Sequence, residues 1–421
     1  MDVTFSTLGA LVGLALAIIL IIKKVHPAYS LIFGALIGGL IGGGGLVNTV
    51  NTMISGAGSM MSSVLRILTS GILAGALIET GSAQKIAETI VDKLGQRRAV
   101  AAISIATMVI CGVGVFVDIS VITVAPIALA IGERAGLSRS GVLLAMIGGG
   151  KAGNIISPNP NTIALSEGFD VSLTSLMVKN IIPAICALVV TIMLSTYLTR
   201  KKDDAITAKD LDGNDNDSNL PPFGKAIAGP LVVIVLLALR PIAGITIDPL
   251  IALPLGGFTS VLITGNTKNT FHIMEFGLSK VIGVAILLIG TGTIAGIIKA
   301  SSLQTDVTNL LTVMHMPAFL LAPLSGILMA AATASTTAGA TVAAQTFAPV
   351  LLKAGVPALS VAAMIHPGAT VLDSLPHGSF FHATGGSVYM SINERAKLIP
   401  YEAVIGLTST VAATAIYLMG F

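Results

Sequence analysis

The sequence predicts an all-α polytopic membrane protein built from two repeats of opposite membrane topology. Of its 421 residues, 54% are hydrophobic and only 10% are charged, whereas an ordinary globular protein has about 25% charged residues. Apolar runs of membrane-spanning length recur along the whole chain, and the two halves share a faint common pattern. The net charge of +3 is small and sits in the loops between apolar runs, which argues against a nucleic-acid partner.

The apolar runs have about the length that crosses a bilayer, roughly 17 to 25 residues. The first is predicted to be retained as a helix, because Lys23 and Lys24 follow it without a small-residue cleavage site. The positive-inside rule places these lysines in the cytoplasm and the N-terminus outside. The runs are 6–22, 28–47, 53–78, 99–117, 174–199, 225–243, 250–265, 274–298, 317–332 and 400–420.

A polar segment at 200–225 divides the chain and is predicted to be a flexible cytoplasmic linker. The first membrane repeat is then 1–199 and the second 226–421. The string AMIGGG at 145–150 matches AMIHPG at 363–368. Because the first half begins outside and ends inside, the second half is expected to be inverted, with the C-terminus outside. Inverted repeats with Gly- and Pro-broken segments are typical of secondary transporters, whose site lies near the bilayer midplane.

The first broken segment, GGGKAGNIISPNPNTIAL, covers residues 148–165. Each proline disfavours a helix at the residue before it, so one helix should end here and another should begin with Asn161 or Thr162 near its N-cap. The free N–H groups of that new helix would face a cavity and favour an anion. A lysine at this depth costs about 2.5–3.5 kcal/mol, so Lys151 is proposed as the counter-charge of an anionic substrate. A turn at the membrane surface with a snorkelling Lys151 is the alternative.

The second broken segment, MIHPGATVLDSLPHGSFFHATGG, gathers further ionisable residues. Carboxyl and imidazole groups can carry a proton through the membrane, although each can equally be a structural polar residue. The candidates for proton coupling are Asp118, His366, Asp373 and His377. A hydroxyl-rich stretch at 331–346 precedes the segment, and its threonines, Thr336 and Thr337 among them, serve either close helix packing or substrate contact.

Three strings carry a resemblance to a known family: GKAGNIISPNPNTIA at 150–164, TTAGATVA at 336–343 and DSLPHGSFF at 373–381. The layout of the whole chain is similar to the gluconate permease (GntP) family, within the ion transporter superfamily. The resemblance implies a symporter of the bacterial cytoplasmic membrane that takes up a small hydroxy-carboxylate, such as gluconate or glycerate, with protons. It also implies re-entrant hairpins, broken helices, an elevator-like movement and a homodimer. Better-known gluconate members resemble PPHPGP where SPNPN stands here.

Matching positions suggest the lining of a substrate site in both broken segments. With Lys151 and the two threonines, the predicted substrate-binding residues are Asn154, Ser157, Asn159, Asn161, Thr162, Thr336, Thr337, Asp373, Ser374, His377, Gly378 and Ser379. No metal or cofactor is expected, because only two cysteines occur and GGGKAG lacks the Ser or Thr of a phosphate-binding loop.

Two alternatives remain beside proton symport. A sodium-coupled di- or tricarboxylate carrier of the same superfamily would use broken-helix carbonyls to hold sodium. An intramembrane hydrolase could be assembled on paper from Ser374, Ser379, His377 and Asp373. Their crowding into seven residues and the absence of a G-x-S-x-G string argue against this enzyme.

Overall fold

The computed structural model describes residues 4–95, 98–199, 206, 220–303, 305–306, 309, 313, 317–376 and 378–420. The regular structure of these residues is helical, with turns, loops and isolated bridge positions at Phe5, Ser138 and Ser301 between the helices. The predicted all-α class is therefore confirmed. Most of the predicted linker at 200–225 lies outside the described residues, so the division of the chain at this segment stays a prediction.

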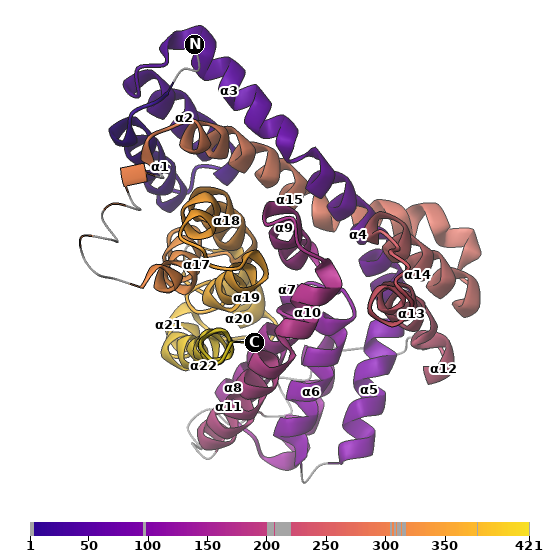
Figure 1. The fold of residues 1–421 in the computed structure, drawn as a ribbon. Coiled ribbons are helices and arrows are strands. Elements are labelled where there is room, and N and C mark those ends of the chain that lie inside the picture. The colour runs from indigo at the N-terminus through magenta and orange to yellow at the C-terminus, as the bar shows by residue number, and fades with distance from the viewer. Residues whose placement is uncertain are drawn as a thin grey trace.

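One group of helices, here called the frame, runs along one flank of the molecule (Figure 1). In it, α15 packs against α2, α3 and α4, and α14 packs against α4 and α13. The frame comprises α1 (Thr7–Ile22), α2 (Pro27–Ile41), α3 (Gly45–Ser59), α4 (Met61–Glu79), α13 (Ala228–Ala243), α14 (Pro249–Thr264) and α15 (Thr270–Lys299), with the 3-10 turn η4 (Thr267–Asn269) before α15.

The second group, here called the site body, packs against the frame and contains both broken segments. Its first half is α6 (Ala99–Gly112), α7 (Val117–Ala135), α8 (Arg139–Asn154), α9 (Pro160–Gly168), α10 (Leu173–Lys179) and α11 (Ile181–Thr199). Its second half is the 3-10 turn η5 (Ala318–Leu320), α17 (Leu321–Thr333), α18 (Thr336–Lys353), α19 (Ala358–Gly368), α20 (Ser379–Gly386), α21 (Ile392–Ala396) and α22 (Ile399–Leu418). The helices α5 (Ser82–Leu94) and α12 (Phe223–Ala226) contact each other beside the two groups.

The two halves of the site body have the same order of elements. In each, a helix ends at a break, at Asn154 or Gly368, and a short helix follows it, α9 or α20. A short connector and a long closing helix complete the set, and the closing helices α11 and α22 contact each other. This order is the one that two repeats require, while their opposite orientation in a membrane stays a prediction.

Four helical stretches among the described residues are long and apolar enough to cross a membrane: Met61–Glu79, Ile181–Thr199, Thr267–Lys299 and Ile392–Leu418. Further apolar helices of 10–17 residues accompany them. The predicted run 53–78 is divided, because α3 ends at Ser59 and α4 begins at Met61. The dividing residue is Met60, and the last turns of α3 before it contain Gly56 and Gly58, whose helix propensity is low.

The glycine-rich string at 148–153 lies inside α8 and does not form a surface turn. Gly149 and Gly153 pack against the backbone of α6, where an added Cβ would overlap with the carbonyl oxygens of Ser104 and Met108. These glycines therefore allow α6 and α8 to approach closely. The surface-turn alternative is wrong for this string, since every residue from Gly141 to Asn154 is buried.

Candidate functional site

The first break is held in shape by its own asparagines. Asn159 is the N-cap of α9, and its Oδ1 accepts hydrogen bonds from the backbone N–H of Asn161 at 2.9 Å and of Thr162 at 3.2 Å. Asn161 and Thr162 therefore lie near the N-cap, two and three residues after it. Pro160 occupies the first helical position, which its fixed φ and missing N–H suit.

Asn154 joins the two sides of this break. Its Oδ1 accepts hydrogen bonds from the side-chain amides of Asn159 and Asn161, the latter at 2.9 Å. Ser157 donates to the carbonyl oxygen of Cys111 at 2.6 Å, which ties the loop to α6. Buried polar groups are costly unless hydrogen-bonded, and these bonds fix the direction in which α9 begins.

The second break is built around Asp373. Its Oδ1 accepts hydrogen bonds from Lys151 Nζ at 2.7 Å and from Ser374 Oγ at 2.9 Å. Its Oδ2 accepts a hydrogen bond from Thr336 Oγ1 at 2.6 Å. Lys151 also donates to the carbonyl oxygen of Thr370 at 2.6 Å. The lysine of the first half therefore pairs with the aspartate of the second half, and the two breaks form one unit.

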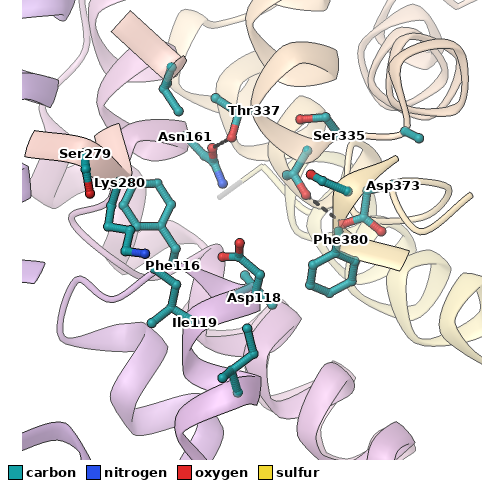
Figure 2. A pocket seen from close by; sticks show the side chains of 16 residues that line it. Phe116, Asp118, Ile119, Asn161, Ser279, Lys280, Ser335, Thr337, Asp373 and Phe380 are labelled. Carbon is teal, nitrogen blue, oxygen red and sulfur yellow. Dashed lines mark hydrogen bonds between the residues drawn. The ribbon is translucent and has the colours of Figure 1, made fainter. Parts of the chain in front are cut away.

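A cavity of about 390 Å³ lies between the frame helix α15 and the ends of the two breaks (Figure 2). Lys280 and Ser279 line it from the frame, and Asp118, Asn161 and Asp373 line it from the site body. Thr337 donates a hydrogen bond to Asn161 Oδ1 across the cavity wall. The complete lining is Phe116, Val117, Asp118, Ile119, Ile122, Asn161, Ser279, Lys280, Val284, Ala334, Ser335, Thr336, Thr337, Asp373, Ser379 and Phe380.

Four helix N-termini meet at this cavity. The helices α7, α9, α18 and α20 each place a residue of their first turn in its lining. The helix dipole places a partial positive charge at each of these ends. At α9 the N–H groups of Asn161 and Thr162 already bind Asn159 Oδ1, so this end contributes through its dipole. Together with the ammonium of Lys280, these ends make the cavity suited to an anion. The hydroxyls of Ser335, Thr336 and Thr337 supply further hydrogen-bonding groups.

The structure brings some of the predicted site residues to the cavity and places others behind it. The cavity is lined by Asn161, Thr336, Thr337, Asp373 and Ser379, and by the proton-coupling candidate Asp118. Behind it lie Lys151, Asn154, Ser157, Asn159, Thr162 and Ser374, all buried, and Gly378, which caps α20. His377 lies outside the described residues.

Two predicted roles need to be reconsidered on this geometry. Lys151 does not line the cavity, because its ammonium is directed to Asp373 and Thr370. His366 is fully buried in α19, neither of its ring nitrogens has a hydrogen-bond partner, and it does not line the cavity either. The cation that faces the cavity is Lys280.

Sequence reasoning missed Lys280 and the buried pair of Arg395 with Glu402. Lys280 and Glu402 each had a signal in the sequence. Lys280 lies within the apolar run 274–298, and Glu402 is the single charged residue of the run 400–420. An ionisable residue inside a membrane segment is by default a candidate functional residue. The paired arginine gave no such signal, because it lies before the run in the loop-like sequence SINERAK.

The comparison with protein families decides what kind of molecule carries this cavity. Residues 5–421 match the model described as GntP family permease. This chain belongs to the GntP family. It is a multi-pass membrane transporter and not an enzyme, so the hydrolase alternative is wrong.

Relatives with similar sequences support the same assignment. An uncharacterized transporter of Haemophilus influenzae is 53% identical over 414 residues, which cover 98% of both chains. The high-affinity gluconate transporter of Escherichia coli is 22% identical, covering 70% of each chain. The D-serine transporter DsdX of Escherichia coli is 23% identical, covering 81% of this permease and 82% of the relative.

Among solved structures, this GntP-family permease resembles the YdaH transporter of Alcanivorax borkumensis. The TM-score is 0.67 at 14% sequence identity, and the match covers 89% of this permease and 88% of that chain. At this identity the likeness concerns the fold alone.

Proposed function

We propose that this permease is a proton-coupled symporter that carries a small hydroxy-carboxylate, such as gluconate, glycerate or a related sugar acid, across the bacterial cytoplasmic membrane. The observation that carries this proposal is the cavity at which four helix N-termini and Lys280 meet. A volume of about 390 Å³ falls in the usual range for small-molecule sites. The substrate carboxylate would lie at the helix ends, and its hydroxyls would bind Asn161 and the neighbouring serine and threonine side chains.

Charge repulsion supports the proton coupling. Asp118 and Asp373 line the same cavity, so an anionic substrate enters next to two carboxyl groups. Like charges in a shared site of low dielectric constant repel each other, and a proton on one carboxyl relieves the repulsion. Binding of the anion is thereby linked to binding of a proton. We assign the proton to one of these two aspartates rather than to His366, which does not line the cavity.

The position of the cavity supports an elevator-like movement. One wall belongs to the frame helix α15 and the others to the site body, so sliding of the site body along α15 would carry the anion with the helix ends. An ion pair that also joins the frame to the site body would have to open in this movement. Arg66 of α4 binds Glu167 near the end of α9 at 2.7 Å, and Asp248 before α14 at 2.6 Å. The homodimer and the outside position of both termini remain predictions of the family resemblance and of the charge pattern.

Uptake into proteoliposomes tests the proposed function. Labelled D-gluconate and D-glycerate are supplied separately, without sodium, with an inward proton gradient imposed or collapsed by an uncoupler. We expect one of the two solutes to accumulate only while the gradient is present, and unlabelled competitors, including D-serine, to rank the substrate class. Accumulation that requires sodium would instead support the sodium-coupled alternative. Absence of uptake under every condition would contradict the proposed substrate class.

A further inference from the structure

Four charged side chains, here called the charge network, extend inward from Asp373 in the cavity wall. Each is at most 5% exposed: Lys151, Asp373, Arg395 and Glu402. Lys151 Nζ lies 2.7 Å from Asp373 Oδ1 and 3.8 Å from Glu402 Oε2. Arg395 donates through Nη1 to Glu402 Oε1 and through Nη2 to Glu402 Oε2, the latter at 3.3 Å. With two cations and two carboxylates, the charge network has no net charge when all four groups are ionised.

Arg395 is held in place independently of the glutamate. Its Nε donates to Thr384 Oγ1 at 3.2 Å, and its guanidinium lies 4.9 Å from the ring centre of Phe381. Both partners belong to α20, the helix whose N-terminus meets the cavity. Glu402 is thereby fixed beside Lys151 as a second carboxylate acceptor, on the side of the ammonium away from the cavity.

A buried lysine with one carboxylate partner would hold that carboxylate ionised, because protonating it leaves an unpaired buried cation. Lys151 has two such partners. When Asp373 takes up a proton, the ammonium can move to Glu402 and remain paired. The second acceptor therefore removes the main energetic obstacle to protonation of a carboxylate that lines the cavity.

We propose that Glu402 and Arg395 are positioning residues for proton coupling, which give Lys151 a second carboxylate so that Asp373 carries the co-transported proton. This inference rests on the proposed symport. A hydronium ion in the cavity gives its proton to Asp373 at the oxygen bonded by Thr336, so one O–H bond of the hydronium breaks as the carboxyl O–H bond forms. The reverse transfer returns the proton to water on the other side of the membrane, and no other covalent bond changes.

The net charge of the charge network explains why proton and anion move together. The charge network without proton or substrate is neutral. With a proton on Asp373 it carries one positive charge, and a bound anionic substrate restores neutrality. A charged site body is costly to move through a membrane, so the empty and the doubly loaded forms cross most readily. The other ionisable groups facing the cavity are Asp118 of α7 and Lys280 of α15, which carry opposite charges when both are ionised and then leave this sum unchanged. Of the nearby histidines, His366 of α19 is buried away from the cavity, and His377 lies outside the described residues.

The test compares Glu402→Gln with the wild type in proteoliposomes, using labelled D-gluconate or D-glycerate, whichever the wild type exchanges. Removing the negative charge of Glu402 leaves the charge network with one positive charge while Asp373 stays ionised, so the anion binds without a proton. We expect substrate counterflow to persist, while the number of protons taken up per substrate falls from about one to near zero. Glu275→Gln is the matched control, because Glu275 is an exposed glutamate of α15 and should keep the wild-type ratio.

A double variant covers the case in which Glu402→Gln leaves Arg395 unpaired and does not fold. Arg395→Gln with Glu402→Gln restores the neutral sum but removes the second acceptor of Lys151. We expect this variant to keep the ratio of protons to substrate and to need a more acidic pH for half-maximal uptake. A wild-type ratio in the single variant, or a wild-type pH profile in the double variant, would overturn the proposal. Folded variants that exchange no substrate would overturn it as well.

An infrared pH titration of the purified protein tests the proton site without any substrate. We expect a protonated-carboxyl band that titrates in the wild type, is absent from Asp373→Asn and moves to lower pH in Glu402→Gln. A band that Asp373→Asn leaves unchanged would overturn the inference, even if neither solute is transported. Failure of uptake with a titrating Asp373 would instead contradict the proposed substrate class, so the two failures are distinguishable.

Discussion

Replacing Lys151 by alanine is expected to lower substrate uptake by at least about 100-fold. The change leaves Asp373 without its ammonium partner, and Glu402 with Arg395 alone. Removing one partner of a buried ion pair costs about 3–5 kcal/mol, and each 1.4 kcal/mol corresponds to about a factor of ten. The loss should affect exchange as well as net uptake, because Asp373 also binds Thr336 in the wall of the cavity.

The measurement is initial uptake per amount of protein that inserts and remains monodisperse in detergent. Lys353→Ala is the matched control, because Lys353 is exposed at the end of α18, and it should transport like the wild type. Normal uptake by Lys151→Ala would remove the buried ion pair from the account.

Replacing Asn161 by leucine is expected to lower uptake by about 10- to 100-fold. Asn161 lines the cavity, accepts a hydrogen bond from Thr337 and donates one to Asn154. The leucine removes the acceptor of Thr337 and one of the two donors to Asn154 Oδ1, and a buried polar group left unsatisfied costs about 1–3 kcal/mol. It also removes an amide that we assign to the substrate hydroxyls.

Asn161→Asp separates packing from charge, because aspartate keeps the shape of the side chain and adds a negative charge beside the anion. We expect Asn161→Asp to raise the substrate concentration for half-maximal uptake, whereas Asn48→Leu, at an exposed position of α3, should change nothing. Wild-type uptake by both Asn161 variants would place the substrate elsewhere.

Much of the fold could be predicted from local sequence, because apolar runs and Gly- and Pro-broken strings act over a few residues. The helices α1, α6, α14 and α15 begin or end within a few residues of the predicted runs. The interruption at SPNPN follows from proline chemistry alone. The cap itself is Asn159, because Pro160 prefers the first helical position after it.

The site was less predictable, because its contacts join distant parts of the chain. Lys151 and Asp373 are 222 residues apart, and nothing in a single sequence specifies that they pair with each other. The same holds for the hydrogen bond between Thr337 and Asn161. Lys280 shows the opposite case, because its position in an apolar run was a usable signal that was not used.

The most direct test of the account is the structure of the permease with its transported solute bound, determined in a lipid nanodisc with whichever of D-gluconate or D-glycerate accumulates. We predict density for the solute in the 390 Å³ cavity, with its carboxylate at the N-termini of α9 and α18 and within reach of Lys280. Density in the separate cavity of about 580 Å³ lined by Lys299 and Gln345 would contradict the assignment of the site.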